Sequence, residues 1–163
     1  MDQVAVSSGE VKSSKRNVPA AVRLQYIVIK MGDEQYGIDI RYVDNIVRMQ
    51  NITRVPKVQA YLKGVINLRG EVIPVVSLRL KMGLPADEYT KNTRIIILKT
   101  ETGNLGIIVD EVREVVTLGE ESIEKMAHEP KDSKASFVNG IGKNGGELIS
   151  LLDRNAITLE SNV

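Results

Sequence analysis

The stretch "YIVIKMGDEQYGIDIRYVDNIV", residues 26–47, lies without a gap over "IIILKTETGNLGIIVDEVREVV", residues 95–116. Six of the 22 aligned pairs are identical, and most of the others keep their apolar or polar character. A second block, "GVINLRGEVIPVV" at 64–76, aligns with "GIGKNGGELISLL" at 140–152. The offset grows from 69 to 76 between the two blocks, so the second copy carries seven extra residues. Because self-similarity of this kind indicates repeated structural units, we interpret the chain as two copies of one unit.

Each copy has the pattern of short β-strands. Both begin with a run rich in β-branched residues, and a polar turn separates that run from a second short strand. Val43, Ile46 and Val47 then follow at the spacing i, i+3, i+4, and three valines repeat this spacing in the second copy. Such spacing predicts a short helical turn with one apolar face.

A β-hairpin is expected to close each copy, with its bend at Arg69-Gly70 or at Gly145-Gly146. The run "EVIPVVSL" is apolar on both faces, which predicts a strand buried between two subdomains. Two copies of about five strands favour two small β-barrels packed on each other. The sequence leaves open whether strands cross from one copy to the other. The final "DRNAITLE" predicts a short helix capped by Asp153.

The predicted organisation is a flexible tail followed by one two-copy domain. Residues 1–22 are rich in Ser and Lys and lack an apolar run of signal-peptide length. The domain is expected over 23–160, with the first copy at about 24–83 and the second at about 93–159. No apolar run approaches the roughly 20 residues that a membrane span needs, so we expect a soluble cytoplasmic protein without membrane insertion.

Composition argues against several classes of function. The 22 basic and 21 acidic residues nearly cancel to +1, whereas nucleic-acid and anionic-lipid binders usually carry a basic excess. The chain has no cysteine and a single histidine, His128, so thiolate and imidazole metal sites are not expected. The glycines of "GIGKNGG" precede a strand and are interpreted as a hairpin turn, not a nucleotide site. We therefore expect no catalytic residues, no metal and no cofactor.

Arg69 is the residue that most suggests recognition. The equivalent position in the second copy is Gly145, so the hairpin does not itself require an arginine. Val65, Leu68 and Val72 surround it in sequence and provide the apolar setting of a binding hot spot. A planar guanidinium suits carboxylates or backbone carbonyls at an interface.

The ordered set "YGIDIRYVDNIV", "GVINLRGEVIPVVSLR" and "RIIILKTETGNLGIIVDEV" resembles the CheW family of bacterial chemotaxis coupling proteins. The resemblance extends from about Leu24 to Leu159. It implies a mainly β fold of two packed, five-stranded SH3-like β-barrel subdomains with short helices. It also implies a non-enzymatic adaptor that couples the helical hairpin tips of chemoreceptors to the regulatory domain of the histidine kinase CheA, at membrane-associated receptor arrays.

The same resemblance implies which residues contact the partners. The receptor-binding residues would be Val43, Asn45, Ile46, Val47, Asn67, Leu68, Arg69 and Gly70. Family members commonly carry a glutamate at the position of Asn45, where it can pair with the arginine, so the partner of Arg69 is left open here. The kinase-binding residues would lie at the ends of the barrels, with Arg94, Ile95 and Ile108 as candidates.

Two other functions remain open from the sequence. The nearest alternative is a CheW-like coupling domain of a related kinase pathway or of a multidomain adaptor, because these share the fold. A small-barrel nucleic-acid binder is a different class, and the near-neutral charge and few aromatic residues argue against it.

Overall fold

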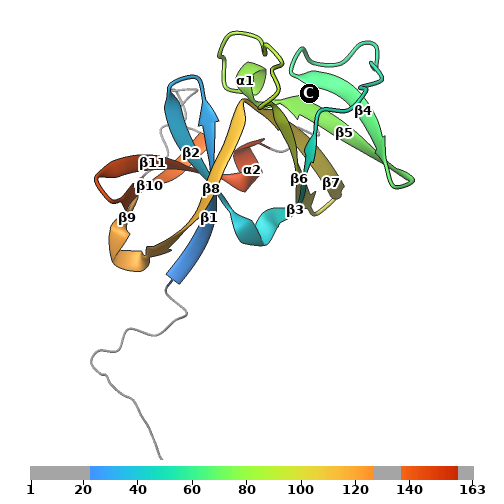
Figure 1. Cartoon of the computed structure of the whole chain (residues 1–163). Coiled ribbons are helices and arrows are strands. Elements are labelled where there is room, and N and C mark those ends of the chain that lie inside the picture. The colour runs from blue at the N-terminus through green and yellow to red at the C-terminus, as the bar shows by residue number, and fades with distance from the viewer. Residues whose placement is uncertain (1–22, 127–136, 158–163) are drawn as a thin grey trace, which may run out of the picture.

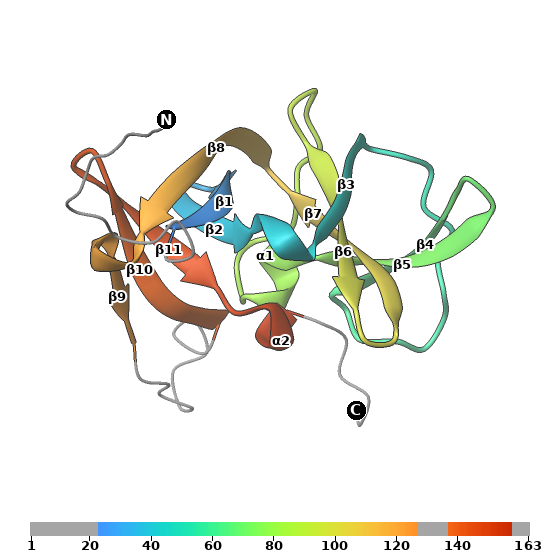
Figure 2. The ribbon, with the colours of Figure 1, turned by 90° about the horizontal axis from the view of Figure 1, so that it is seen from below.

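The computed structural model describes residues 23–126 and 137–157. The expected tail at 1–22 and His128 lie outside these ranges. The chain forms two β-sheets side by side, with short helices between and around them (Figures 1 and 2). The mainly β architecture with two subdomains, predicted from the sequence, is confirmed.

The two sheets differ by one strand. The six-stranded sheet contains, in spatial order, β8 (Glu111–Gly119), β1 (Arg23–Met31), β2 (Glu34–Asp39), β11 (Glu147–Leu152), β10 (Val138–Asn144) and β9 (Ile123–Lys125). The five-stranded sheet contains β3 (Val43–Arg48), β6 (Arg94–Thr100), β7 (Gly103–Val109), β5 (Glu71–Ser77) and β4 (Leu62–Leu68). The helices are η3 (Ile40–Tyr42), α1 (Leu78–Lys81), η4 (Glu120–Ser122) and α2 (Arg154–Ile157).

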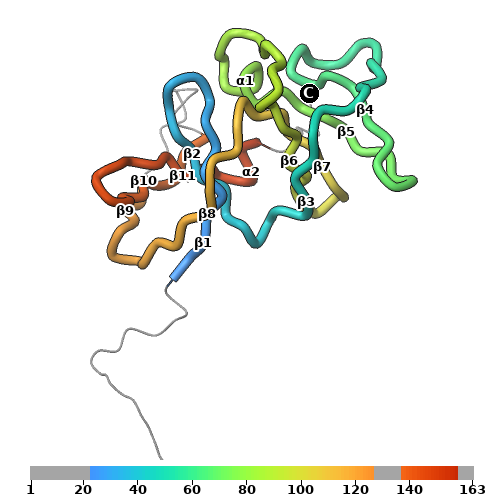
Figure 3. Tube along the Cα trace, in the orientation of Figure 1, coloured from blue at the N-terminus to red at the C-terminus, as the bar shows by residue number. Residues whose placement is uncertain are grey.

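Strands are exchanged between the two copies of the repeat. The hairpin β1–β2 belongs to the first copy but lies among β8 to β11 of the second. The hairpin β6–β7 of the second copy likewise lies among β3, β4 and β5 of the first, as the trace in Figure 3 shows. Parallel pairing of β2 with β11, and of β5 with β7, joins the copies in each sheet. Neither half of the chain can therefore complete its sheet alone.

The extra strand of the six-stranded sheet, β9, comes from the seven-residue insertion in the second copy. β9 lies in that longer connection and pairs with β10, with Glu124 opposite Ile141. In the first copy the corresponding contact is a single bridge between Thr53 and Val65. The expectation of five strands in each subdomain is therefore wrong for one of them, because the longer connection has room to form a short strand.

Alternate side chains of β1 and β6 enter different cores. This gives both strands continuous apolar runs, as expected for strands buried on both faces. The core between the two sheets includes Ile27, Ile29, Ile96 and Leu98. A second core, on the other face of the six-stranded sheet, includes Tyr26 and Val28. A third core, on the other face of the five-stranded sheet, includes Ile95 and Ile97. These two cores are called the interiors of their sheets below.

The run "EVIPVVSL" behaves as predicted in its second half only. Val75 and Val76 are fully buried, one in the interior of the five-stranded sheet and the other in the core between the sheets. Val72, near the start of the same strand, is 63% exposed. The strand is thus buried on both faces beyond Ile73 and leaves its hairpin end in solvent.

The predicted helical turn at Val43 to Val47 is wrong, because these residues form strand β3. A β-bulge between Val43 and Asn45 shifts the alternation of side chains along the strand. Val43 consequently packs on the core between the sheets, Ile46 faces solvent and Val47 packs inside the five-stranded sheet. The bulge thereby produces the i, i+3, i+4 spacing of apolar residues that also characterises a helix.

The second copy repeats this arrangement in β8, where the pairing with β1 also shifts its register. Val112 packs on the core between the sheets, Val115 is 50% exposed and Val116 is buried inside the six-stranded sheet. Each copy therefore has a bulged strand at this place instead of the predicted helical turn.

Candidate interaction surfaces

The β4–β5 hairpin projects from the five-stranded sheet and carries Arg69 at its tip (Figure 3). Leu68 pairs with Glu71, so Arg69 and Gly70 form a two-residue turn, as predicted. Their φ angles of 54° and 84° are both positive, as a type I′ turn requires. The β10–β11 hairpin makes the same turn with Gly145 and Gly146 at 58° and 90°.

Arg69 occupies a backbone conformation that a glycine would adopt without strain. A non-glycine residue in the left-handed region costs on the order of 1 kcal/mol. Within the described residues no hydrogen bond or ion pair holds its guanidinium. The arginine therefore contributes a costly backbone conformation and an exposed cation, which together point to a role outside the folding of this chain.

Asn45 does not bind Arg69 through its side-chain oxygen. The Oδ1 atom of Asn45 instead accepts a hydrogen bond of 2.8 Å from the backbone N–H of Ile46. Asn45 itself is half-buried in β3, and Ile46 beside it is 37% exposed. Of the four candidate residues in β3, Ile46 is the one that presents an exposed apolar side chain.

The remaining receptor candidates lie at the end of β4. Asn67 and Gly70 are exposed, whereas Leu68 is half-buried against the interior of the five-stranded sheet. Asn67 pairs across the hairpin with Val72, which is exposed as well. The hairpin end thus combines a cation, an amide and an exposed aliphatic group.

The three candidate kinase contacts are poorly placed for a partner. Ile95 and Ile108 are fully buried inside the five-stranded sheet, so their side chains are withdrawn from the surface. Arg94 is half-buried, and its guanidinium donates hydrogen bonds of 2.8 and 2.9 Å to the carbonyls of Lys91 and Thr93. These residues have a structural role in the observed fold.

Four exposed aliphatic residues form two repeat-related pairs, and only Ile46 and Val72 among them were singled out from the sequence. Val72 in β5 and Leu148 in β11 are separated by the offset of 76, and both are 63% exposed. Ile46 in β3 and Val115 in β8 are separated by the offset of 69, and both are exposed. The repeat alignment already pairs these positions, but only the structure tells that they face solvent.

A hollow of about 610 Å³ is lined by residues of the six-stranded sheet, η3 and α2. Figure 2 shows α2 between the two sheets. Tyr42 and Arg154 line the hollow, and the Arg154 guanidinium stacks 4.1 Å from the centre of the Tyr42 ring. Arg154 also donates a hydrogen bond to the Lys99 carbonyl on the five-stranded sheet. Burial, followed by the nearby charge of Asp39, raises the pKa of Tyr26 at the same hollow, so this phenol stays neutral.

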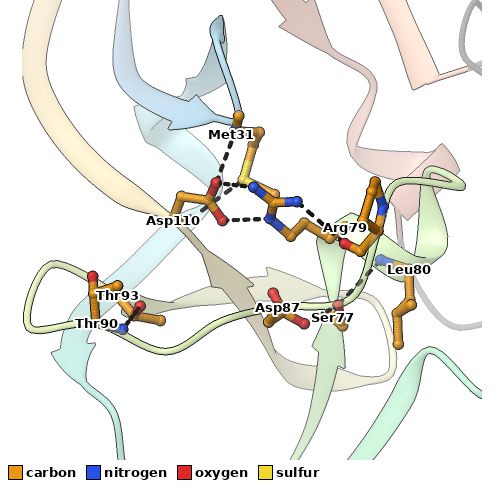
Figure 4. Close-up of polar contacts among 10 residues, drawn as sticks. Met31, Ser77, Arg79, Leu80, Asp87, Thr90, Thr93 and Asp110 are labelled. Atoms are coloured by element: carbon orange, nitrogen blue, oxygen red, sulfur yellow. Dashed lines mark hydrogen bonds and ion pairs between the residues drawn. The ribbon is translucent and has the colours of Figure 1, made fainter.

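An ion pair holds the place where the chain passes from β7 to β8 (Figure 4). The Arg79 guanidinium donates two hydrogen bonds, of 2.8 and 2.7 Å, to the two carboxylate oxygens of Asp110. The N–H of Gly32, in the β1–β2 turn, donates another to the same carboxylate. Burial alone would raise the pKa of Asp110, but these hydrogen bonds outweigh it, and the pKa lies below its usual range.

The described part of the chain contains no cluster of histidine and carboxylate side chains arranged to hold a metal ion. Within the same residues, none of the helices has the length and apolar character needed to cross a membrane. Candidate contact surfaces among the described residues include the Arg69 hairpin, the exposed aliphatic pairs and the hollow beside η3.

Comparison with known proteins agrees with this description. The family model of the CheW-like domain matches residues 25–161. The chain belongs to the CheW-like family. It is 38% identical to the chemotaxis protein CheW of Bacillus subtilis (strain 168) over 131 residues, which cover 80% of this chain and 84% of that protein. It is 36% identical to CheW of Helicobacter pylori (strain ATCC 700392 / 26695), covering 79% of this chain and 78% of that one.

Among solved structures, the CheW-like chain is similar to the scaffolding protein TtCheW from Thermoanaerobacter tengcongensis. The TM-score is 0.74 and the sequence identity 34%, and the match covers 80% of this chain and 88% of that one. Membership of this family makes the protein a chemotaxis scaffold of the CheW type.

Proposed function

We propose that this CheW-like protein is a non-enzymatic cytoplasmic adaptor that couples chemoreceptor signalling tips to the regulatory domain of the histidine kinase CheA. The observation that carries the proposal is Arg69, which keeps an unpaired guanidinium in a strained turn where the second copy has a glycine. Membership of the CheW-like family supplies the partner classes.

The receptor would bind through the Arg69 hairpin, with β3 contributing Ile46. Arg69 offers a planar cation to carboxylates or carbonyls on the receptor helix, and Ile46 offers an exposed apolar contact. The hollow lined by Tyr42 and Arg154 is a second place where an amphipathic helix could lay its apolar face. Because η3 links β2 to β3 and Arg154 of α2 bonds the Lys99 carbonyl, receptor binding at this hollow would act on both sheets.

The kinase regulatory domain would use a different surface. The fully buried Ile95 and Ile108 do not suit this role, and Leu148 suits it better because it is exposed and lies on the six-stranded sheet, away from the Arg69 hairpin. Val72, on the Arg69 hairpin, would belong to the receptor surface, so the two partners would bind at separate places. Modest contacts repeated in an array become strong, because each bound neighbour raises the local concentration of the next.

The test is calorimetric titration of the protein with two purified fragments, a receptor signalling-tip hairpin and the CheA regulatory domain. Binding to both, without mutual exclusion, is the expected result. The variant Arg69→Ala should weaken receptor binding and leave kinase binding unchanged, and Arg113→Ala, an exposed change in β8 of the other sheet, should affect neither. A folded sample that binds neither fragment would overturn the proposed function.

A further inference from the structure

The charges of this nearly neutral chain are unevenly distributed. Between Asp44 and Glu71 there is no acidic residue over residues 45–70, whereas five basic residues occur there. The five are Arg48, Arg54, Lys57, Lys63 and Arg69. Since the whole chain has only one net positive charge, this segment forms a strongly basic region of the surface.

The middle of this segment, residues 49–63, forms the rim of a cleft of about 1010 Å³ beside β4. Figure 3 shows the connection between β3 and β4 as a wide loop next to the β4–β5 hairpin. Two backbone hydrogen bonds of 2.8 Å between Thr53 and Val65 tie the loop to β4. A Cβ atom on Gly64 would lie 2.1 Å from the Thr53 carbonyl oxygen, so the close approach depends on that glycine.

The cleft combines cations with exposed apolar side chains. Arg54, Lys57 and Lys63 line it, and no hydrogen bond or ion pair within the described residues holds any of the three. Val55 and Val58 are 37% and 38% exposed along the same loop, facing solvent without cover. Tyr89, 50% exposed, lines the cleft from the connection before β6.

Two further features mark the cleft as built for a ligand. Lys57 has a φ of 61°, a left-handed conformation that lysine rarely adopts and that costs on the order of 1 kcal/mol. A neighbouring hollow shares Met49 with the cleft and is lined by Arg48, Lys91 and Arg94. Among the described residues that line either hollow there is no carboxylate. The cations that line the two hollows therefore meet no carboxylate in either lining.

We infer that this cleft binds an acidic peptide segment of a partner protein, with aliphatic side chains of that segment seated against Val55, Val58 and Tyr89. The cations of the cleft favour a ligand with carboxylates, and the exposed valines favour a ligand with apolar side chains between those carboxylates. A concave site holds one extended chain, whereas a membrane surface would need a flat or convex one. A single aromatic residue gives single-stranded nucleic acid too little to stack on. The inference does not rest on the proposed receptor or kinase binding.

The experiment uses the full chain and a fluorescein-labelled peptide of about 12 residues in which Glu and Asp alternate with Leu, followed by fluorescence anisotropy. Replacement of Arg54, Lys57 and Lys63 together by Gln should weaken binding about tenfold, since three exposed ion pairs are each worth a fraction of a kcal/mol. The matched control replaces Arg23, Arg113 and Lys143, three exposed cations on the other sheet, by Gln and has the same net charge.

Two separate measurements test whether the apolar residues of the cleft contact the peptide. Methyl NMR should show shifts at Val55 and Val58 on addition of the peptide, and Val58→Ser should weaken binding without changing its salt dependence. Circular dichroism and melting curves would establish that every variant is folded. Equal binding by the two triple variants, equal binding of a peptide with Gln and Asn in place of the acids, or tighter binding of an oligo-dT strand would each overturn the inference.

Discussion

Val72 and Leu148 occupy the same position in the two closing hairpins, and each is 63% exposed to solvent. Val72 lies opposite Asn67, and Leu148 lies opposite Lys143, so each aliphatic side chain stands beside a polar one. An exposed aliphatic residue is common on protein surfaces. Its recurrence at equivalent places in both copies makes these two residues candidates for contact with a partner.

Replacement of Val72 or Leu148 by Ser should leave the free energy of unfolding nearly unchanged, within about 0.5 to 1 kcal/mol, because both side chains face solvent. Leu148→Ser should weaken binding to the CheA regulatory domain about tenfold, and Val72→Ser should weaken binding to the receptor fragment, as loss of an interface anchor does. Calorimetry measures this directly. Thr117→Ser, at an exposed position of β8, is the control for loss of a β-branched residue, and unchanged binding by both variants would reject these contacts.

Arg69→Gly separates the folding role of this residue from its binding role. Glycine removes the strain of the left-handed turn, so the variant should be as stable as the parent or more stable, by up to about 1 kcal/mol. It should also lose receptor binding, because the guanidinium is gone. Arg69→Ala removes the same group and keeps the strain. A receptor affinity that survives in both variants would show that Arg69 has no part in recognition.

Asp110→Asn should destabilise the protein by about 1 kcal/mol at pH 7, because it weakens the contact with Arg79. The pKa of Asp110 in the folded state lies below that of the unfolded chain. Its stabilising effect is therefore complete above the unfolded pKa, near 3.9, and is lost as the pH falls through the folded value.

Urea unfolding at several pH values tests this dependence. The difference in unfolding free energy between the parent and Asp110→Asn should be constant near neutrality and shrink on acidification below about pH 4. Asp33→Asn, at an exposed position in the neighbouring turn, should show no such difference. A difference that stays the same down to strongly acidic pH would mean that the ion pair does not carry the effect.

Gly64→Ala should prevent folding or cost several kcal/mol, since the added methyl group would clash with the Thr53 carbonyl. Gly83→Ala is the matched control, because Gly83 also has a positive φ, of 79°, but open space around it. It should cost only about 1 kcal/mol. Thermal unfolding of the two variants compares the clash with the backbone strain alone.

The sequence by itself determined the repeat, the class of fold and the two hairpin turns. The strand runs "YIVIK" and "RIIIL" have consecutive apolar residues, as strands buried on both faces do. The pairs Arg69-Gly70 and Gly145-Gly146 contain the glycines that tight hairpin turns with positive φ favour. These are local properties, so they can be read from neighbouring residues. The hairpin turn at Arg69 was predicted in this way and is observed.

Tertiary structure decided what depends on distant residues. The bulge before Asn45 makes β3 imitate helical spacing, and only the register with β6 distinguishes the two. Exchange of the hairpins β1–β2 and β6–β7 between sheets places Ile95 and Ile108 in a core and leaves Val72 and Leu148 outside. Burial of a residue depends on the strand that covers it, and that strand comes from the other half of the chain.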